Sequence, residues 1–368
     1  MPSSPLSLLV YRDRIGVPSE IEFLRRQYVG FTTLAPLWIG RHVMPRAAEL
    51  GAPLLRLGGG GLLGGAHRAL YRRLARLPRL DLPPHAHVLH AQFARGGALA
   101  LPLARKLGVP MVVTLHGGDI SKTRNFHRGM LLRRWPDVIA ATRRFVCVSA
   151  AVAEQARRRG VQSEQIVVLP IGADTPDSPP PTVSGQPYHL FVGRFVAKKG
   201  IDVLADAVRR LRATGDGTLV VCAGDGPLRP AMEALARETT GVALSGWLPP
   251  REVAARMAGA CALLVPSIVA ENGDAEGLPS VIPEAMAQAC PVIGSNEGGI
   301  AEAVTDGSTG LLVPPGDAGA LAEAMRRLAY DRALRHALGQ AAFAHARAHL
   351  NARVQSAALE KLLLEVAG

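Results

Sequence analysis

Two glutamates with seven residues between them form the strongest candidate site, in the string NGDAEGLPSVIPEAMAQ. We expect Glu276 in a loop after an apolar strand and Glu284 about one turn into the helix that follows. The backbone N–H groups of Gly277 and Leu278 then lie near that helix N-terminus, where partial positive charge favours a diphosphate. Carboxylates around a diphosphate would accept hydrogen bonds from sugar hydroxyls. Glu284 alone also suits the first turn of an ordinary helix, so the full string carries the prediction.

A second candidate group is the string GRFVAKKG, residues 193–200. It follows an apolar run and opens a helical pattern, so Arg194 and Lys199 are expected near the carboxyl end of a strand. Two cations in that position could clamp two phosphates. An ordinary surface ion pair uses the same residue types. Arg194 and Lys199 lie about 80 residues before Glu276 and, like Glu276, follow the end of a predicted strand. This shared position favours phosphate binding over an ordinary surface ion pair.

Both halves of the chain alternate short apolar runs with helical patterns, which is typical of parallel α/β sheets. In the first half we predict strands at 7–11, 34–39, 87–92, 110–117, 144–150 and 166–170. In the second half we predict strands at 189–193, 218–224, 242–247, 261–267, 291–295 and 310–314. The predicted helices of that half are 201–213, 228–238, 250–258, 280–289 and 318–329.

Residues 174–187, DTPDSPPPTVSGQP, cannot continue a helix or a central strand and predict a linker. The 368 residues suit two domains. We predict domains at 1–173 and 188–345, and a C-terminal helix at 346–368 that packs back toward the first domain. The predicted fold class is α/β, with two doubly wound Rossmann-like domains facing a cleft. Ligands of such sheets bind at the carboxyl ends of the strands.

The net charge of +12 is concentrated in the first half of the chain. Residues 1–175 hold 25 Lys and Arg against 10 Asp and Glu. This excess of positive charge indicates an anionic partner, which could be a nucleic acid, a phosphorylated substrate or a membrane. A basic surface that is solvated and binds no partner is the alternative. Four scattered cysteines without a CxxC exclude a disulfide scaffold and a cysteine zinc ribbon, and they suit a reducing cytosol. No apolar run is long enough to span a bilayer.

Residues 67–80, HRALYRRLARLPRL, place leucines on one helical face and arginines elsewhere. This pattern suits a helix lying on an anionic membrane, although leucines that pack into a core would give the same pattern. The candidate membrane contacts are Arg68, Arg72, Arg73 and Arg76.

Together these motifs resemble the retaining glycosyltransferases of family 4, which have the GT-B fold, over nearly the whole chain. GRFVAKKG, the GWLP step at 246–249, the Pro-Ser at 266–267 and the two-glutamate string occur in the family's order. NGDAEGLP resembles bacterial exopolysaccharide and capsule transferases. LHAQFARGGALALPLARKLGVPMVVTLHGGDI (89–120) is similar to that subgroup's segment with HxHF and TlHGxDi. VPSE (17–20) resembles its PSET, but Ile-Glu-Phe follows where the subgroup often has Thr-Phe.

The resemblance implies a role for each candidate residue. Donor binding would fall to Gly16, Arg194, Lys199, Glu276, Gly277, Leu278 and Glu284. The catalytic group would be His116, Glu276, Arg194 and Lys199, and the acceptor-side candidates are Ser19, Glu20 and Asp119. In this scheme the two cations bind the diphosphate, Glu276 holds hydroxyls of the transferred sugar, Glu284 binds the ribose and His116 faces the sugar.

The implied reaction moves a sugar from a UDP- or GDP-sugar to an acceptor hydroxyl, with retention. The expected acceptor is a lipid-linked glycan of surface polysaccharide synthesis, and a soluble acceptor such as a natural product is the alternative. No DxD motif stands in a metal-binding loop, so no metal or other cofactor is expected. We expect a cytoplasmic protein, peripheral on the inner face of the membrane.

Two rival functions remain at this point. The pI near 10.3 favours a nucleic-acid-binding protein, but no recognisable binding module or aromatic platform supports it, and no nucleic-acid partner is expected. A nucleotide-sugar epimerase of the same fold is the other rival. The two-glutamate string with GRFVAKKG argues against it.

Overall fold

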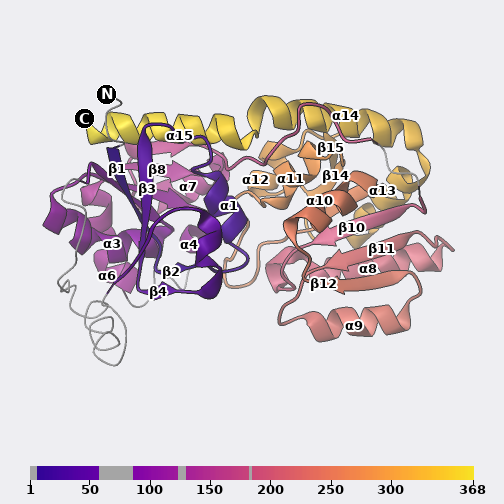
Figure 1. Ribbon diagram of the computed structural model, residues 1–368. Coiled ribbons are helices and arrows are strands. Elements are labelled where there is room, and N and C mark those ends of the chain that lie inside the picture. Colours follow the sequence, from indigo (N-terminus) through magenta and orange to yellow (C-terminus); the bar gives the residue numbers. More distant parts are fainter. Residues whose placement is uncertain (1–5, 58–85, 123–129, 182–184) are drawn as a thin grey trace. The chain divides into compact units, whose positions relative to one another are not determined.

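The computed structural model describes residues 6–57, 86–122, 130–181 and 185–368 (Figure 1). The predicted membrane helix at 67–80, with Arg68, Arg72, Arg73 and Arg76, lies outside the described residues. The chain divides into two compact units. The first comprises Met1–Ile171 and Ala352–Gly368, and the second comprises Gly172–Asn351.

The first unit is built on a parallel sheet with the strand order β5-β3-β1-β6-β7-β8-β9. These strands are β5 (Leu54–Arg56), β3 (Leu34–Gly40), β1 (Leu6–Tyr11), β6 (Val88–Gln92), β7 (Met111–Leu115), β8 (Thr142–Cys147) and β9 (Ile166–Val168). A separate short pair joins β2 (Arg14–Ile15) to β4 (His42–Val43). The main chain leaves β1 toward β3 on one side and returns to β6 on the other, so the order of the sheet reverses between β1 and β6.

Helices surround this sheet. They are α1 (Ile21–Arg26), α3 (Ala94–Leu107), α4 (Gly118–Ser121), α6 (Met130–Ala141), α7 (Ala150–Arg158) and α15 (Ala352–Ala367), with 3₁₀ turns η1 (Pro45–Leu50) and η2 (Ser163–Gln165). The C-terminal helix α15, yellow in Figure 1, contacts β6 and α1 although some 250 or more residues separate them in the sequence. The first unit therefore depends on the last segment of the chain.

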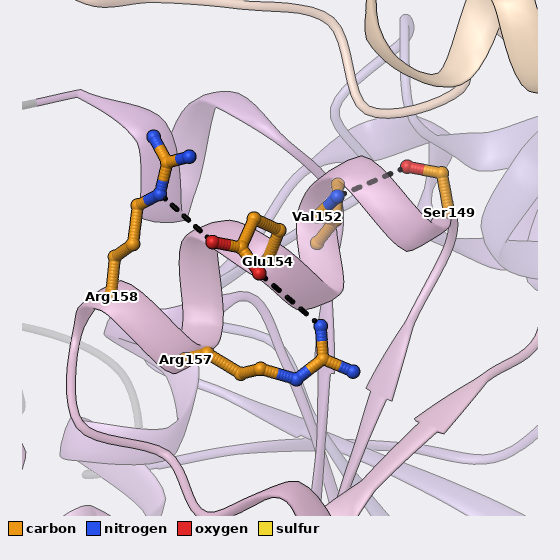
Figure 2. A network of polar contacts seen from close by, with 5 residues as sticks. All are labelled: Ser149, Val152, Glu154, Arg157 and Arg158. Carbon is orange, nitrogen blue, oxygen red and sulfur yellow. Dashed lines mark hydrogen bonds and ion pairs between the residues drawn. The ribbon is translucent and has the colours of Figure 1, made fainter.

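Helix α7 shows how local sequence sets the point where a strand gives way to a helix (Figure 2). Ser149 Oγ accepts a hydrogen bond from Val152 N at 3.3 Å, which caps the first turn. Glu154 then accepts from Arg158 Nε at 3.0 Å and lies 3.4 Å from Arg157 Nη1. These ion pairs are exposed to water, so each contributes little to the stability of the helix. The cap therefore decides where the helix begins.

The second unit contains a parallel sheet with the order β12-β11-β10-β13-β14-β15. Its strands are β12 (Val242–Gly246), β11 (Leu219–Ala223), β10 (Tyr188–Val192), β13 (Ala262–Val265), β14 (Val292–Ser295) and β15 (Gly310–Val313). The helices are α8 (Ile201–Ala213), α9 (Arg229–Glu238), α10 (Pro250–Gly259), α11 (Val281–Ala287), α12 (Gly298–Ala303), α13 (Ala318–Tyr330) and α14 (Arg332–His349), with the 3₁₀ turn η3 (Ala197–Lys199).

Both faces of this second sheet are covered. Along β10, Leu190 belongs to one apolar cluster and the adjacent Phe191 to another, because successive side chains of a strand point to opposite faces. Both side chains are almost completely buried. A sheet that is buried on both faces explains why its strands are continuous apolar runs, which made them recognisable in the sequence.

The predicted fold class is confirmed, because two doubly wound parallel sheets are present. Each predicted strand corresponds to an observed one, displaced by at most three residues at either end. The predicted boundaries differ from the observed ones in detail. The change of unit comes at Gly172, and the predicted segment 346–368 starts inside α14, whereas only α15 is assigned to the first unit.

Candidate functional site

The second unit has a natural binding position where β10 and β13 lie side by side. From β10 the chain proceeds through β11 to β12 on one side, and then returns to β13 on the other side. The loops that follow β10 and β13, residues 193–200 and 266–280, therefore leave the sheet in different directions. Ligands of open parallel sheets bind at such switch points. Both candidate strings of the sequence lie on these two loops.

Close packing holds the two loops together. Gly200 has a φ of +66°, and a Cβ there would collide with the carbonyl oxygen of Pro266. Next to it, Ile268 N donates a hydrogen bond to Lys198 O at 2.9 Å. Gly200 is therefore needed both for the left-handed backbone and for the close approach, and the Lys198–Lys199 pair is fixed against the end of β13.

Two lysines and two carboxylates meet at this position. Lys199 Nζ lies 3.1 Å from Glu276 Oε1, and Lys198 Nζ lies 3.4 Å from the same oxygen. Lys198 Nζ also lies 3.3 Å from Asp274 Oδ1. The four side chains are between 12% and 21% exposed, so these contacts are shielded from water. The two strings are thus joined by a direct contact between Lys199 and Glu276.

The charges in this cluster stabilise one another. Burial opposes the charge on Glu276, but Lys199 and Lys198 outweigh it and hold the pKa of the carboxyl below its usual value. Burial likewise opposes the charge on Lys198, but Glu276 and Asp274 raise its pKa. Glu276 and Lys198 therefore remain ionised at neutral pH. Lys198 and Asp274 were not predicted, although both lie inside the two strings that drew attention to this position.

Apart from Gly16, which lies in the first unit, the other predicted donor-site residues lie on the same two loops or at the start of α11. Arg194 is exposed, and no carboxylate of the described residues pairs with it. Glu284 lies in the first turn of α11, and its backbone N donates to Ser280 O at 3.3 Å. Gly277 is buried, and the side chain of Leu278 packs on an apolar cluster beneath the loop. Arg194 is therefore a cation left open to an anionic ligand.

The first unit places His116 directly after β7, at the carboxyl end of that strand. Asp119 fixes the turn, because its carboxylate accepts hydrogen bonds from His116 N at 2.9 Å and from Ala94 N at 2.8 Å. Burial raises the pKa of Asp119, and these N–H groups oppose the rise. Asp119 therefore fixes the conformation of the loop that follows β7.

Aromatic rings surround the His116 imidazole. Its centroid lies 4.3 Å from that of Phe93 and 5.2 Å from that of Phe23. Burial, with smaller electrostatic contributions from Arg12 and His90, lowers the pKa of His116 to about 3. The ring is therefore neutral at physiological pH.

The acceptor-side candidates are only partly brought together. Glu20 accepts two hydrogen bonds from Arg12, at 2.9 and 2.7 Å, and the Arg12 guanidinium lies 4.3 Å from the centroid of the Phe93 ring. Ser19 is exposed in the preceding turn. Gly16 has a φ of +90°, and a Cβ there would lie 2.6 Å from Ala47 N, so packing against η1 already requires glycine. Arg12 and Phe93 were missed because a lone arginine or phenylalanine carries no local signal.

Two family models match the chain, one in each half. The family described as "Glycosyltransferase Family 4" matches residues 35–176, and "Glycosyl transferases group 1" matches residues 186–331. The alpha-maltose-1-phosphate synthase of Mycolicibacterium smegmatis is 32% identical over 280 residues, which cover 68% of this chain and 70% of that protein. The chain belongs to glycosyltransferase family 4.

Two further proteins are similar to this chain, one in sequence and one in structure. The putative colanic acid biosynthesis glycosyltransferase WcaL of Salmonella typhimurium is 34% identical over 257 residues, or 66% of this chain. The match spans 62% of the length of WcaL. Among solved structures, Anabaena HepE in complex with UDP and glucose has a TM-score of 0.76 at 17% identity, covering 98% of this chain and 100% of HepE. That likeness establishes the GT-B fold.

Two further properties of the described part of the chain concern metals and membranes. It contains no group of three or more His, Cys, Asp and Glu side chains arranged to hold a metal ion. None of its helices combines the length and the apolar character that crossing a bilayer requires.

Proposed function

We propose that this family 4 protein is a retaining, metal-independent glycosyltransferase that uses a UDP- or GDP-sugar. The observation that carries the proposal is the Lys199–Glu276 contact at the β10/β13 switch point, with the open cation Arg194 on the same loop. Cations suit a diphosphate, and a carboxylate suits sugar hydroxyls. The complex of HepE with UDP and glucose supports a nucleotide-sugar donor.

In the proposed reaction the bond between C1 of the sugar and the diphosphate oxygen breaks, and a bond from C1 to the acceptor oxygen forms. Negative charge develops on the leaving diphosphate, where Arg194 and Lys199 stabilise it. The acceptor hydroxyl loses its proton to the leaving phosphate on the same face of the sugar, which gives retention. Glu276 orients the sugar through its hydroxyls. His116 is neutral, so it contributes a hydrogen bond and no charge.

For the acceptor we propose a lipid-linked glycan of surface polysaccharide synthesis, handled by a protein that is peripheral on the inner face of the membrane. The similarity to WcaL, a putative colanic acid biosynthesis glycosyltransferase, supports the pathway. The excess of Lys and Arg in residues 1–175 supports an anionic acceptor or surface.

The test is donor hydrolysis and transfer with a panel of UDP- and GDP-sugars. Glu276→Ala should reduce turnover by about 10²-fold, in line with the loss of one preorganised polar contact. Arg194→Ala should weaken binding of the nucleoside diphosphate more than binding of the nucleoside. Glu238→Ala, an exposed surface change on α9, is the matched control. Near-normal turnover in a folded Glu276→Ala variant would contradict the proposal. So would an increase in melting temperature with duplex DNA but not with UDP or GDP.

A further inference from the structure

A chain of buried polar groups leads from His116 into the core of the first unit. His116 Nε2 lies 2.8 Å from Gln92 Oε1. Gln92 Nε2 lies 2.7 Å from the hydroxyl of Tyr28, which in turn lies 2.8 Å from His90 Nδ1. His90 Nε2 ends the chain 2.6 Å from Thr114 Oγ1. Gln92, His90 and Thr114 have no exposed surface, so water does not compete for these contacts.

The partners of Gln92 decide how its amide is oriented. Its nitrogen lies 2.8 Å from Gln27 Oε1 as well as 2.7 Å from the hydroxyl of Tyr28, so both amide hydrogens have acceptors. The carbonyl oxygen is then the group that faces His116. If the amide of Gln92 were flipped, its two N–H groups would have His116 as their only acceptor. One of them would stay unpaired in the core, which is unfavourable.

This orientation fixes the proton on the imidazole. A carbonyl oxygen only accepts, so His116 Nε2 must carry the hydrogen that it donates to Gln92. A neutral imidazole has one N–H, which leaves Nδ1 as an acceptor with its lone pair. None of the described residues donates a hydrogen bond to Nδ1. The packing of Phe93 and Phe23 around the ring hinders a rotation that would exchange the two nitrogens.

We propose that Gln92 is a positioning residue that holds His116 in the Nε2–H form, so that Nδ1 accepts a hydrogen bond from a hydroxyl of the substrate. The identity of that substrate as a sugar rests on the proposed function, but the tautomer does not. Gln92 lies at the end of β6 and His116 follows the adjacent strand β7, so the sheet itself sets their distance. Substrates that offer a donor at this point are favoured over those that offer only an acceptor.

The tautomer can be read directly from the ¹⁵N chemical shifts of the full-length protein labelled at histidine. The sequence has 11 histidines, and the His116→Asn variant assigns the signals of His116. At pH 7.5 we expect a protonated Nε2 and an unprotonated Nδ1. A protonated Nδ1 in the parent protein overturns the proposal. This measurement needs no Gln92 variant, so it stands even where a variant fails to fold.

Variants then test whether Gln92 is responsible. Gln92→Met keeps the side-chain volume but removes the acceptor, so the Nε2–H preference should disappear. Gln92→Glu restores an acceptor oxygen, so it should restore the Nε2–H form and raise the pKa of His116, because a carboxylate stabilises the imidazolium. Thr114→Val is the matched control: it removes the hydroxyl that lies 2.6 Å from His90 Nε2, at the far end of the network from Gln92, and should leave the tautomer in place. An unchanged tautomer in Gln92→Met overturns the proposal.

Kinetics separate this inference from the proposed function. With the preferred nucleotide sugar, Gln92→Met should lower kcat/KM about tenfold, with partial recovery in Gln92→Glu. An unchanged kcat/KM in a Gln92→Met variant that has lost the Nε2–H preference would overturn the positioning role. If the parent consumes no nucleotide sugar, the proposed function fails, whereas the NMR measurements still decide how Gln92 acts on His116.

Discussion

Replacing Glu360 with Ala should strongly destabilise the first unit, because this glutamate of α15 holds the start of β3. Its side chain is 5% exposed, and its carboxylate accepts hydrogen bonds from three consecutive backbone N–H groups. These are Thr32 N at 2.9 Å, Thr33 N at 2.7 Å and Leu34 N at 2.7 Å. Some 326–328 residues separate the carboxylate from these donors. The contact therefore fastens the end of the chain to its beginning.

The magnitude follows from the charge and the burial. A hydrogen bond to a charged group contributes about 1.5–3 kcal/mol, but three donors sharing one carboxylate do not add independently. Glu360→Ala leaves three backbone N–H groups without their acceptor, at about 1–3 kcal/mol for each buried donor, so we expect a non-additive loss of about 3–5 kcal/mol. Glu360→Gln keeps an acceptor oxygen without the charge, so about half of that loss is expected.

The pH dependence gives a second measure of the same contact. Burial opposes the charge on Glu360, but the N–H groups of residues 32–34 outweigh it and lower the pKa. A lowered folded-state pKa means that the contact stabilises the protein above the unfolded value near 4.5. This stability is lost as the pH falls through the folded-state pKa. The difference between the parent and Glu360→Gln should therefore shrink below about pH 4.5.

Hydrogen exchange is the appropriate assay, because a protein of two units need not unfold in one step. Amides of β3 should exchange faster in Glu360→Ala by the factor that corresponds to the lost free energy. Glu365→Ala, an exposed change on the same helix, should stay within about 0.5 kcal/mol of the parent. If Glu360→Ala matches Glu365→Ala in β3 exchange, the carboxylate contributes nothing and the reasoning is refuted.

Three further predictions concern other parts of the chain. Gly200→Ala should lower the unfolding free energy by about 2 kcal/mol or more and weaken UDP or GDP binding, measured by denaturation and calorimetry, since a Cβ meets a carbonyl there. Burial lowers the pKa of His189 to about 4. The unfolding free energy should therefore fall by at most about 3 kcal/mol as the pH drops from 6.5 toward 4, and it should fall by less in His189→Gln. Reversal of Arg72, Arg73 and Arg76 to Glu should abolish salt-sensitive binding to anionic liposomes and leave donor hydrolysis intact; unchanged binding would contradict a membrane role.

The parallel sheets and the site of the second unit could be predicted because their signals are local. A strand that is buried on both faces reads as an apolar run, and the polar residues after it lie at the carboxyl edge of the sheet. Lys199 and Glu276 each lie in the segment that leads from such a run to the next helix. Their contact then follows from strand order, since β10 and β13 are neighbours.

The interactions that could not be predicted join residues with no local pattern. Gln27, Gln92 and His116 come from three separate segments, and each is an unremarkable polar residue in its own neighbourhood. The Glu360 carboxylate likewise looks like one more charge on a C-terminal helix. Only the folded backbone brings the donors and acceptors together, because hydrogen bonding at buried positions depends on distances of a few tenths of an ångström.

The charge balance of the Lys198–Lys199 cluster bears on how a donor would be recognised. Asp274 and Glu276 already neutralise the two lysines, so an approaching diphosphate meets no net positive charge from these four groups. Arg194 has no such partner among the described residues, and it therefore provides the attraction at first contact. Lys199 can turn to the phosphates at low cost only if another group takes its place beside Glu276. A sugar hydroxyl can do so, which couples recognition of the diphosphate to recognition of the sugar.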